Sequence, residues 1–278
     1  MRFDVLVLGG GTAGCALAAR LSESPERSVC LVEAGPDYGL YAGGRWPDDI
    51  LDARSLAFSH AWETDGEDRS QLRARILGGC SAHNACVVLE GAPSDYDDWG
   101  HGWSYDTVRP HLQRAREQLR TRPTTEAELT PWHRAFAAAA PDAILHPVNA
   151  VGTLRWNAAF AYLDPARSRP NLTILGDILV DRVRLDGTRA TGASTSAGEI
   201  EAETVVVTAG AYGSPGILLR GAGASRRRRP LRPRRGRVRV RADGGVPPRD
   251  PRVRARASRA DGPGHGGDPQ QSLPRGRL

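Results

Sequence analysis

The chain of 278 residues contains no lysine, so all 38 of its basic side chains are arginines. It has a single methionine, and aromatic residues make up only 6% of the sequence. No apolar stretch approaches the roughly 18 consecutive residues of a membrane-spanning helix, so we expect no membrane span. An apolar strand is expected from Phe3 onward, where a secretory leader would otherwise lie. We therefore expect no signal peptide and a cytoplasmic location.

Cysteine is also scarce. The four cysteines are Cys15, Cys30, Cys80 and Cys86, and none forms a CxxC pair. This spacing argues against a zinc site, and we expect no metal centre. Cys15 falls in an expected helix and Cys30 in an expected strand, so both are predicted to be buried thiols of a protein from a reducing compartment.

Charge is distributed unevenly along the sequence. Residues 226–278 contain 17 arginines and four aspartates, whereas residues 1–225 carry seven more acidic than basic side chains. The basic segment has no Ile, Phe, Tyr, Trp, Met or Cys. Such a segment buries too little apolar area to offset its ordering entropy. We therefore expect a folded region at 1–225 and a disordered Arg/Pro/Gly-rich tail at 226–278.

A glycine motif opens the chain. Residues 9–14 read Gly-Gly-Gly-Thr-Ala-Gly, directly after an apolar run, and Glu33 closes a second apolar run. The order of strand, glycine turn, helix, strand and acid is typical of a dinucleotide-binding fold. Gly9 makes the tight turn, Gly11 admits a pyrophosphate, and Gly14 lets the helix pack on the strand. The helix amino terminus holds phosphates, and Glu33 accepts from a ribose hydroxyl.

Hydrophobic periodicity and turn residues predict the remaining elements. We expect strands at 3–8, 28–33, two within 171–185, and 189–196, followed by a short buried central parallel strand at 203–210. We expect helices at about 12–23, 104–119, 132–140 and 214–220. Ser104 is a plausible amino-terminal cap, and Pro215 is expected in the first turn of the last helix.

Two further motifs carry a family resemblance. Residues 75–99 read RILGGCSAHNACVVLEGAPSDYDDW, and residues 208–219 read TAGAYGSPGILL. Together with GGGTAG and LVEAG near the amino terminus, they resemble the glucose–methanol–choline (GMC) family of flavin oxidoreductases, in the family's order across 1–220. The resemblance implies an α/β fold of the Rossmann-like, FAD-binding GMC type. It also implies that this fold is incomplete, with a truncated substrate domain.

The resemblance implies FAD as cofactor and a small alcohol as substrate, and it leaves the electron acceptor open. The implied cofactor-binding residues are Gly9, Gly11, Thr12, Ala13, Gly14, Glu33 and Ala34 for the ADP half, Gly78, Gly79, His83, Asn84, Ala85, Cys86 and Val87 along the pyrophosphate and isoalloxazine, Val180 beside the adenine, and Ala209 and Gly210 over the cofactor.

His83 allows two interpretations. The string around it is similar to choline-oxidase-type members, in which the matching histidine is bonded covalently to the flavin. Alternatively, His83 only packs or hydrogen-bonds near the flavin. The serine that follows the His-Asn pair in those members is Ala85 here, which makes choline a doubtful substrate. The shortened stretch before residues 155–163 also resembles that of compact, mycofactocin-associated members.

The family's catalytic histidine is expected beyond residue 278, so no catalytic residue is assigned. His265 is the only histidine of the tail and is interpreted as a solvated loop residue. The third motif departs from the family after Arg220, where Gly-Ala-Gly-Ala-Ser replaces Ser-Gly-aliphatic-Gly. We hypothesise that a frameshift or a sequencing error near 220–226 causes this departure and the change in charge. The chain as encoded is then inactive, a non-catalytic FAD-binding remnant of an enzyme.

Two other functions are suggested by single features of the sequence. An NAD-linked dehydrogenase accounts for the first motif but leaves the other two unexplained. Nucleic-acid binding through the arginine tail is favoured only by charge. Because no aromatic residue interrupts the tail, it has no base-stacking platform, and we expect no nucleic-acid partner.

Overall fold

The computed structural model describes residues 1–62, 73–140 and 144–226. All of these residues belong to one compact unit, Met1–Leu231. The predicted tail lies outside the described residues from 227 onward, so its disorder and the domain boundary at 225 remain predictions. Among the described residues, no helix is long and apolar enough to cross a membrane.

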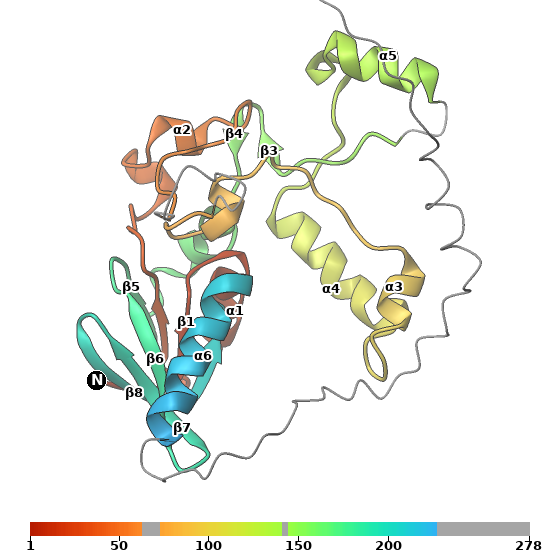
Figure 1. Ribbon diagram of the computed structural model, residues 1–278. Helices are drawn as coiled ribbons and strands as arrows, with labels where there is room; N and C mark the ends of the chain where they lie inside the picture. The colour runs from red at the N-terminus through yellow and green to blue at the C-terminus, as the bar shows by residue number, and fades with distance from the viewer. Residues whose placement is uncertain (63–72, 141–143, 227–278) are drawn as a thin grey trace, which may run out of the picture. The chain divides into compact units, whose positions relative to one another are not determined.

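A mixed six-stranded sheet forms the centre of the unit, with strand order β5-β2-β1-β8-β7-β6 (Figure 1). The strands β5, β2, β1 and β8 are parallel, whereas β8, β7 and β6 form an antiparallel meander. Their bounds are β1 (Arg2–Leu8), β2 (Val29–Val32), β5 (Leu172–Leu175), β6 (Val180–Asp186), β7 (Arg189–Thr195) and β8 (Gly198–Val207). The predicted α/β class is confirmed, as are the two strands within 171–185 and the hairpin that follows them.

The helices of the structure include all four predicted ones, with different bounds for the last, and two short helices that were not predicted. They are α1 (Thr12–Leu21), α2 (Asp48–Leu51), α3 (Pro93–Asp97), α4 (Tyr105–Gln118), α5 (Pro131–Ala139) and α6 (Gly210–Arg226), with a small sheet of β3 (Ala150–Val151) and β4 (Leu154–Arg155). The prediction that a helix starts at 214 was wrong, because α6 already begins at Gly210. Pro215 therefore lies inside the helix, in its second turn, where it lacks the amide that would bond the carbonyl oxygen of Ala211.

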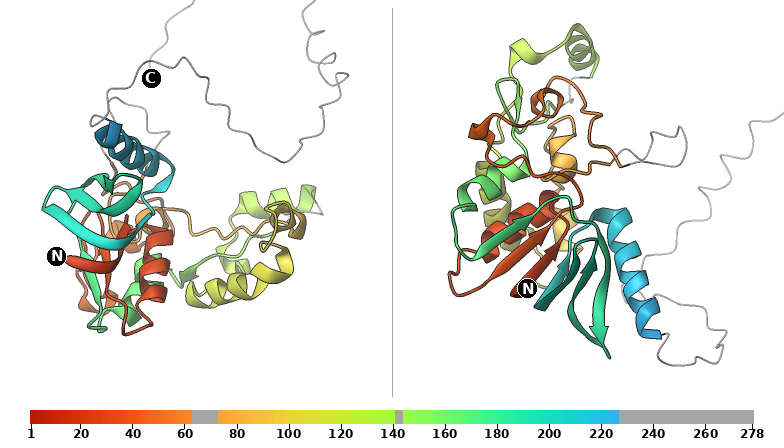
Figure 2. Two further views of the ribbon diagram at one scale, coloured as in Figure 1. Left: turned by 90° about the horizontal axis from the view of Figure 1, so that it is seen from below. Right: turned by 90° about the vertical axis from the view of Figure 1, so that its left-hand side faces the viewer.

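Two apolar clusters cover the two faces of the sheet. Because side chains alternate along a strand, Val5 and Val7 of β1 enter one cluster, and Leu6 and Leu8 enter the other. Helix α1 packs into the first cluster, whereas α6 enters the second through Ile217, so the helices lie on opposite faces (Figure 2). Cys15 and Cys30, both predicted to be buried, lie one in each cluster.

Strand β8 differs from the prediction of a short buried strand at 203–210. It is longer, and its last three residues, Val205–Val207, are only half-buried. Residues Gly198–Glu201 pair with β7, and β1 pairs along β8 as far as Val207. Beyond Glu201 the strand therefore has a neighbour on one side only among the described residues. The predicted burial requires neighbours on both sides.

An aromatic cluster is centred on Phe160, a residue of the first apolar cluster. Phe160 lies in the π-helical turn η5 (Ala159–Leu163) and is 2% exposed. Its ring centroid is 4.8 Å from that of Trp46, 5.1 Å from that of Tyr41 and 5.7 Å from that of Trp156. This cluster joins the segment at 41–46 to the segment at 156–160.

The substitution Phe160→Ala is expected to lower the free energy of unfolding by about 3–5 kcal/mol, because it opens a cavity in a packed aromatic cluster. Urea unfolding of both proteins measures the change. Phe136→Ala is the matched control, since Phe136 on α5 is 66% exposed and its truncation should change stability by less than about 0.5 kcal/mol. Equal losses for the two variants would contradict the assigned packing.

Candidate functional site

The first glycine turn joins β1 to α1 at the carboxyl end of the parallel strands. Gly9 has φ +111°, and a Cβ added there would lie 2.8 Å from the Cα of Ala209. A Cβ on Gly14 would lie 1.9 Å from the carbonyl oxygen of Gly9. A side chain at either position would clash with the backbone, as the motif predicts. The contact at Gly9 also brings Ala209 of the third motif against the turn.

The amino terminus of α1 is open. Gly11 is the cap residue, no side chain caps the helix, and its first turn holds no acidic residue. Thr12 and Ala13 are exposed. A Cβ added to Gly11 would meet only the Cα of Gly79, at 3.9 Å. Unlike Gly9 and Gly14, Gly11 therefore borders free space, and the uncapped helix end presents its amides to an anion there.

The second glycine motif lies directly against the first. The amide of Gly78 donates to the carbonyl oxygen of Gly10 at 2.8 Å. Gly79 has φ +55°, and a Cβ on it would lie 2.6 Å from the Cα of Gly11. Two segments separated by more than sixty residues thus meet backbone to backbone, which only glycine permits. This contact forms one continuous cradle from the two predicted motifs.

Glu33 closes the cradle at the end of β2. Its two carboxylate oxygens accept hydrogen bonds from the amides of Gly10 (2.7 Å) and Gly35 (2.9 Å). Burial raises the pKa of this carboxyl, and the hydrogen bonds to backbone amides oppose that rise. Each oxygen retains a lone pair for a further donor, which is the chemistry that a ribose hydroxyl needs. The carbonyl oxygen of the neighbouring Ala34 is already bonded by the Nε of Arg75 at 2.9 Å.

The ring of His83 points into the protein. Its Nε2 lies 3.0 Å from the carbonyl oxygen of Ser59, and the residue is 5% exposed. Because a carbonyl only accepts, Nε2 carries the proton and Nδ1 holds the lone pair. Burial lowers the pKa of the imidazole and so favours its neutral form. The geometry favours the interpretation of His83 as a packing residue that ties the second motif to residue 59.

The residues that follow His83 form an irregular segment beside the cradle. Asn84 is exposed, and its Oδ1 accepts from the amide of Cys86 at 3.0 Å. Cys86 is buried with φ +61°, whereas Ala85 and Val87 on either side of it are exposed. Both exposed neighbours can therefore face a bound group, while the Cys86 side chain packs inward.

Two further predicted residues begin β6 and α6. Val180 begins β6, is buried, and belongs to the second apolar cluster. Gly210 starts α6 with φ +73°. In the part of the chain that the structure describes, no group of three or more His, Cys, Asp or Glu side chains could hold a metal ion.

Sequence reasoning missed a buried arginine next to the site. Arg155 is fully buried, and no acidic side chain among the described residues pairs with it. Its Nε donates to the carbonyl oxygen of Ile50 at 2.9 Å, and its Nη2 donates to those of Asp52 and Ser55 at 2.6 Å each. Its Nη1 lies 3.8 Å from the Sγ of Cys86. Arg155 therefore fixes residues 50–55 against the irregular segment.

Asn157 is a second residue that the sequence did not single out. It is fully buried, and its Oδ1 accepts from the amides of Ala159 (2.9 Å) and Phe160 (3.2 Å). Its Nδ2 has no hydrogen-bond partner among the described residues. A Cβ on Gly78 would lie 3.2 Å from its Oδ1, so Asn157 borders the second glycine motif.

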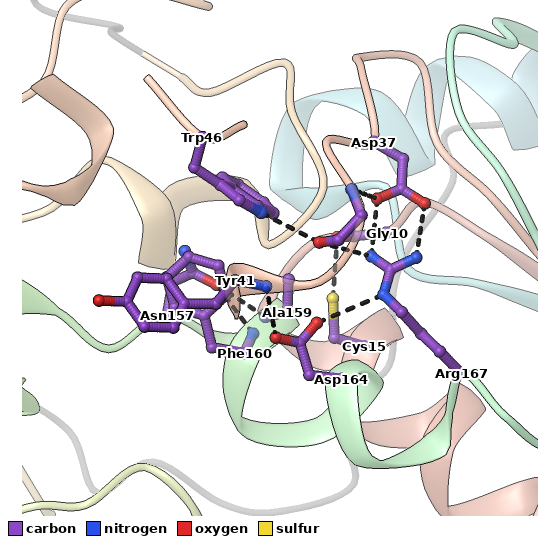
Figure 3. Close-up of polar contacts among 11 residues, drawn as sticks. Gly10, Cys15, Asp37, Tyr41, Trp46, Asn157, Ala159, Phe160, Asp164 and Arg167 are labelled. Atoms are coloured by element: carbon purple, nitrogen blue, oxygen red, sulfur yellow. Dashed lines mark hydrogen bonds and ion pairs between the residues drawn. The ribbon is translucent and has the colours of Figure 1, made fainter. Parts of the chain in front are cut away.

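An ion-pair clamp holds the loop that follows Glu33 (Figure 3). Arg167 contacts both carboxylate oxygens of Asp37, at 2.6 and 2.8 Å, and also pairs with Asp164 at 3.3 Å. Asp164 in turn accepts from the amide of Tyr41 at 2.9 Å. Asp37 and Arg167 are 130 positions apart, so no local pattern indicates this pair, whereas Asp164 lies only three residues before Arg167. The sequence alone therefore does not identify Arg167 as part of this clamp.

Comparisons with known proteins agree with this geometry. Residues 4–264 match the family model described as FAD dependent oxidoreductase. The chain is 31% identical over 258 residues to an uncharacterized GMC-type oxidoreductase of Rhodococcus erythropolis, covering 78% of this chain and 52% of that protein. It is 30% identical over 273 residues to an oxygen-dependent choline dehydrogenase of Serratia proteamaculans, covering 79% of this chain and 48% of that protein.

Among solved structures, pyridoxine 4-oxidase from Mesorbium loti superposes with a TM-score of 0.65 at 28% identity, covering 77% of this chain and 51% of that one. The chain therefore spans about half the length of the relatives that it matches. The matching family model, these relatives and the joined glycine motifs agree: the chain belongs to the FAD-dependent oxidoreductases, and among them to the GMC type.

Proposed function

We propose that the chain is the FAD-binding half of an alcohol oxidoreductase. The observation that carries the proposal is the contact of the two glycine motifs at the open amino terminus of α1, where Gly78 donates to Gly10 and Gly79 packs on Gly11. The free space beside Gly11 and the uncapped helix fit a pyrophosphate, and the buried Glu33 fits a ribose hydroxyl.

The proposed contacts follow the cradle. The amides of Thr12 and Ala13 hold the pyrophosphate, with Gly9, Gly11 and Gly14 allowing its approach, while Glu33 and Ala34 border the ribose. The remaining proposed contacts are Gly78, Gly79, His83, Asn84, Ala85, Cys86 and Val87 toward the isoalloxazine, Val180 toward the adenine, and Ala209 and Gly210 over the cofactor. Bound FAD would supply the acceptor for a hydride from an alcohol carbon.

An alcohol is the proposed substrate class because relatives are named for choline and pyridoxine, which both carry hydroxyl groups. No catalytic base is assigned, since the family's histidine is expected in the half of the relatives that this chain does not span. We therefore propose that the chain alone binds FAD without turning over an alcohol. An NAD-linked function leaves the motif at 75–99 without a role, although that motif forms half of the cradle.

Gly11→Ala should separate cofactor binding from folding. Its Cβ meets no backbone closer than 3.9 Å, so the protein without cofactor should keep its stability, but the methyl group fills the space for the pyrophosphate. We expect FAD affinity to fall by roughly 100-fold, or about 2.8 kcal/mol, measured by fluorescence titration. Gly43→Ala, where an added Cβ has no neighbour within 4 Å, is the matched control. Unchanged affinity in the Gly11 variant would place the cofactor elsewhere.

The flavin is expected to be non-covalent. Because the His83 ring is buried in the protein and its Nε2 bonds the Ser59 carbonyl, acid precipitation of the loaded protein should release all flavin into the supernatant. Flavin that remains with the pellet, and is lost from it in His83→Ala, would instead establish the covalent interpretation.

The loaded chain should also fail to react with alcohols. Anaerobic addition of choline or pyridoxine is expected to leave the visible flavin absorbance unchanged, whereas chemical reduction with dithionite bleaches it. Bleaching by an alcohol would show that the described half contains sufficient catalytic groups and would overturn the proposal of an inactive half.

A further inference from the structure

A cavity of about 290 Å³ lies between the carboxyl-terminal half of α1, helix α4 and the segment 162–169. Each helix lines it with one face, because its lining residues are spaced i, i+3, i+4 and i+7. These residues are Ala16, Ala19, Arg20 and Glu23 from α1 and the turn that follows it, and His111, Arg114, Ala115 and Gln118 from α4. None of them belongs to the glycine cradle, so the proposed cofactor site does not account for this cavity.

Hydrogen bonds hold the walls of the cavity together. Arg169 donates through its Nη1 to the carbonyl oxygen of Ala19, which joins the segment 162–169 to α1. At the other wall, the Nε1 of Trp156 donates to the carbonyl oxygen of Gln118 at 3.1 Å, and the guanidinium of Arg120 lies 3.7 Å from the ring centroid of the same indole. The end of α4 is thereby fixed against the segment before η5, so the chain forms the cavity with its own contacts.

Positive charge predominates in the cavity. Three arginines line it, Arg20, Arg114 and Arg169. Glu23 is the one acidic side chain among the described residues that line it, and it already pairs with Arg20 at 2.5 Å. In the part of the chain that the structure describes, no acidic side chain or carbonyl oxygen pairs with Arg114. Two positive charges therefore remain uncompensated around one small volume, and a bound dianion would balance them.

The other polar side chains of the cavity, His111, Gln118 and Tyr162, can also donate hydrogen bonds. None of the three side chains bonds another described residue. An imidazole carries at least one N–H group, and a glutamine amide carries two. Burial raises the pKa of the Tyr162 hydroxyl, which therefore keeps its proton for donation. This set of donors matches the oxygens of an anion, which only accept.

We propose that the cavity binds a small phosphate monoester, whose phosphate is held by Arg20, Arg114 and Arg169. A monoester phosphate carries nearly two negative charges at neutral pH, which is the charge that the cavity lacks. The guanidinium group offers parallel N–H donors that bind two oxygens of one phosphate at once. The inference goes beyond the proposed function and does not depend on FAD binding.

The apolar part of the lining identifies the ligand as an ester rather than free phosphate. It consists of the methyl groups of three alanines, the ring of Pro165 and the ring of Tyr162. Free phosphate would leave this surface without a partner, whereas a flat organic group covers it. Small-molecule sites have volumes of about 300–1,000 Å³. The cavity lies at the lower end of that range, so the organic group is limited to about one ring.

The test measures binding of phenyl phosphate to the full chain by isothermal titration calorimetry at about 0.15 M salt, which screens long-range attraction. We expect phenyl phosphate to bind roughly tenfold more tightly than inorganic phosphate, which lacks the ring, or benzoate, which lacks the second charge. Arg114→Gln should weaken its binding roughly tenfold or more. Ala115→Leu should weaken it by a similar factor, because the larger side chain fills the cavity without changing its charge.

Arg109→Gln is the matched control. It removes the same charge from α4 at an exposed residue that does not line the cavity, so the affinity should stay within about twofold. Gly11→Ala should also leave the affinity for phenyl phosphate unchanged, which separates the cavity from the cradle. Circular dichroism checks that each variant folds.

Equal losses in Arg114→Gln and Arg109→Gln, or undiminished binding in Ala115→Leu, would overturn the site. Equal affinities for phenyl phosphate and inorganic phosphate would overturn the monoester as its ligand, and loss of binding in Gly11→Ala would assign the anion to the cradle. FAD titration of the same proteins reports separately on the proposed function. A chain that binds FAD but not phenyl phosphate refutes only the cavity, and a chain that binds phenyl phosphate but not FAD refutes only the cofactor site.

Discussion

Close backbone approach at glycine is the constraint on which the site depends. Gly14 seats α1 against the turn at Gly9, and Gly79 seats the second motif against Gly11. A methyl group at Gly9, Gly14 or Gly79 would force segments apart by more than a side-chain adjustment can absorb. The Gly78 amide then bonds the Gly10 carbonyl, so the cradle is fixed by backbone atoms. Its shape is therefore set before any cofactor binds.

Much of this site could be predicted because it is encoded locally. The strand, glycine turn, helix and acid at 3–33 lie within one short segment, and each residue's role follows from backbone geometry. The second and third motifs were found by resemblance, and the structure brings both against the first through Gly78 and Ala209. The predicted start of the last helix at 214 is wrong because the prediction assigns Pro215 to the first turn, where proline is favoured, whereas the structure places it in the second.

The supporting residues could not be predicted, since their partners are remote in sequence. Arg155 binds three carbonyls about one hundred positions away, and Arg167 pairs with Asp37 across the fold. An arginine without a nearby acid looks like a surface residue until the chain is folded. The same reasoning explains β8. Its apolar run predicts burial on both sides, but burial depends on a neighbour that the described residues do not provide.

The open edge and the cradle are physically linked through the end of β8. Thr208 donates from its Oγ1 to the carbonyl oxygen of Gly9 at 2.8 Å, and Ala209 forms the wall that Gly9 packs against. An edge strand frays more readily than a strand paired on both sides, because its hydrogen bonds are exposed to water. A better-ordered end of β8 therefore also orders the wall of the glycine turn. By the same linkage, a cofactor bound in the cradle should reduce the fraying of β8 at 205–207.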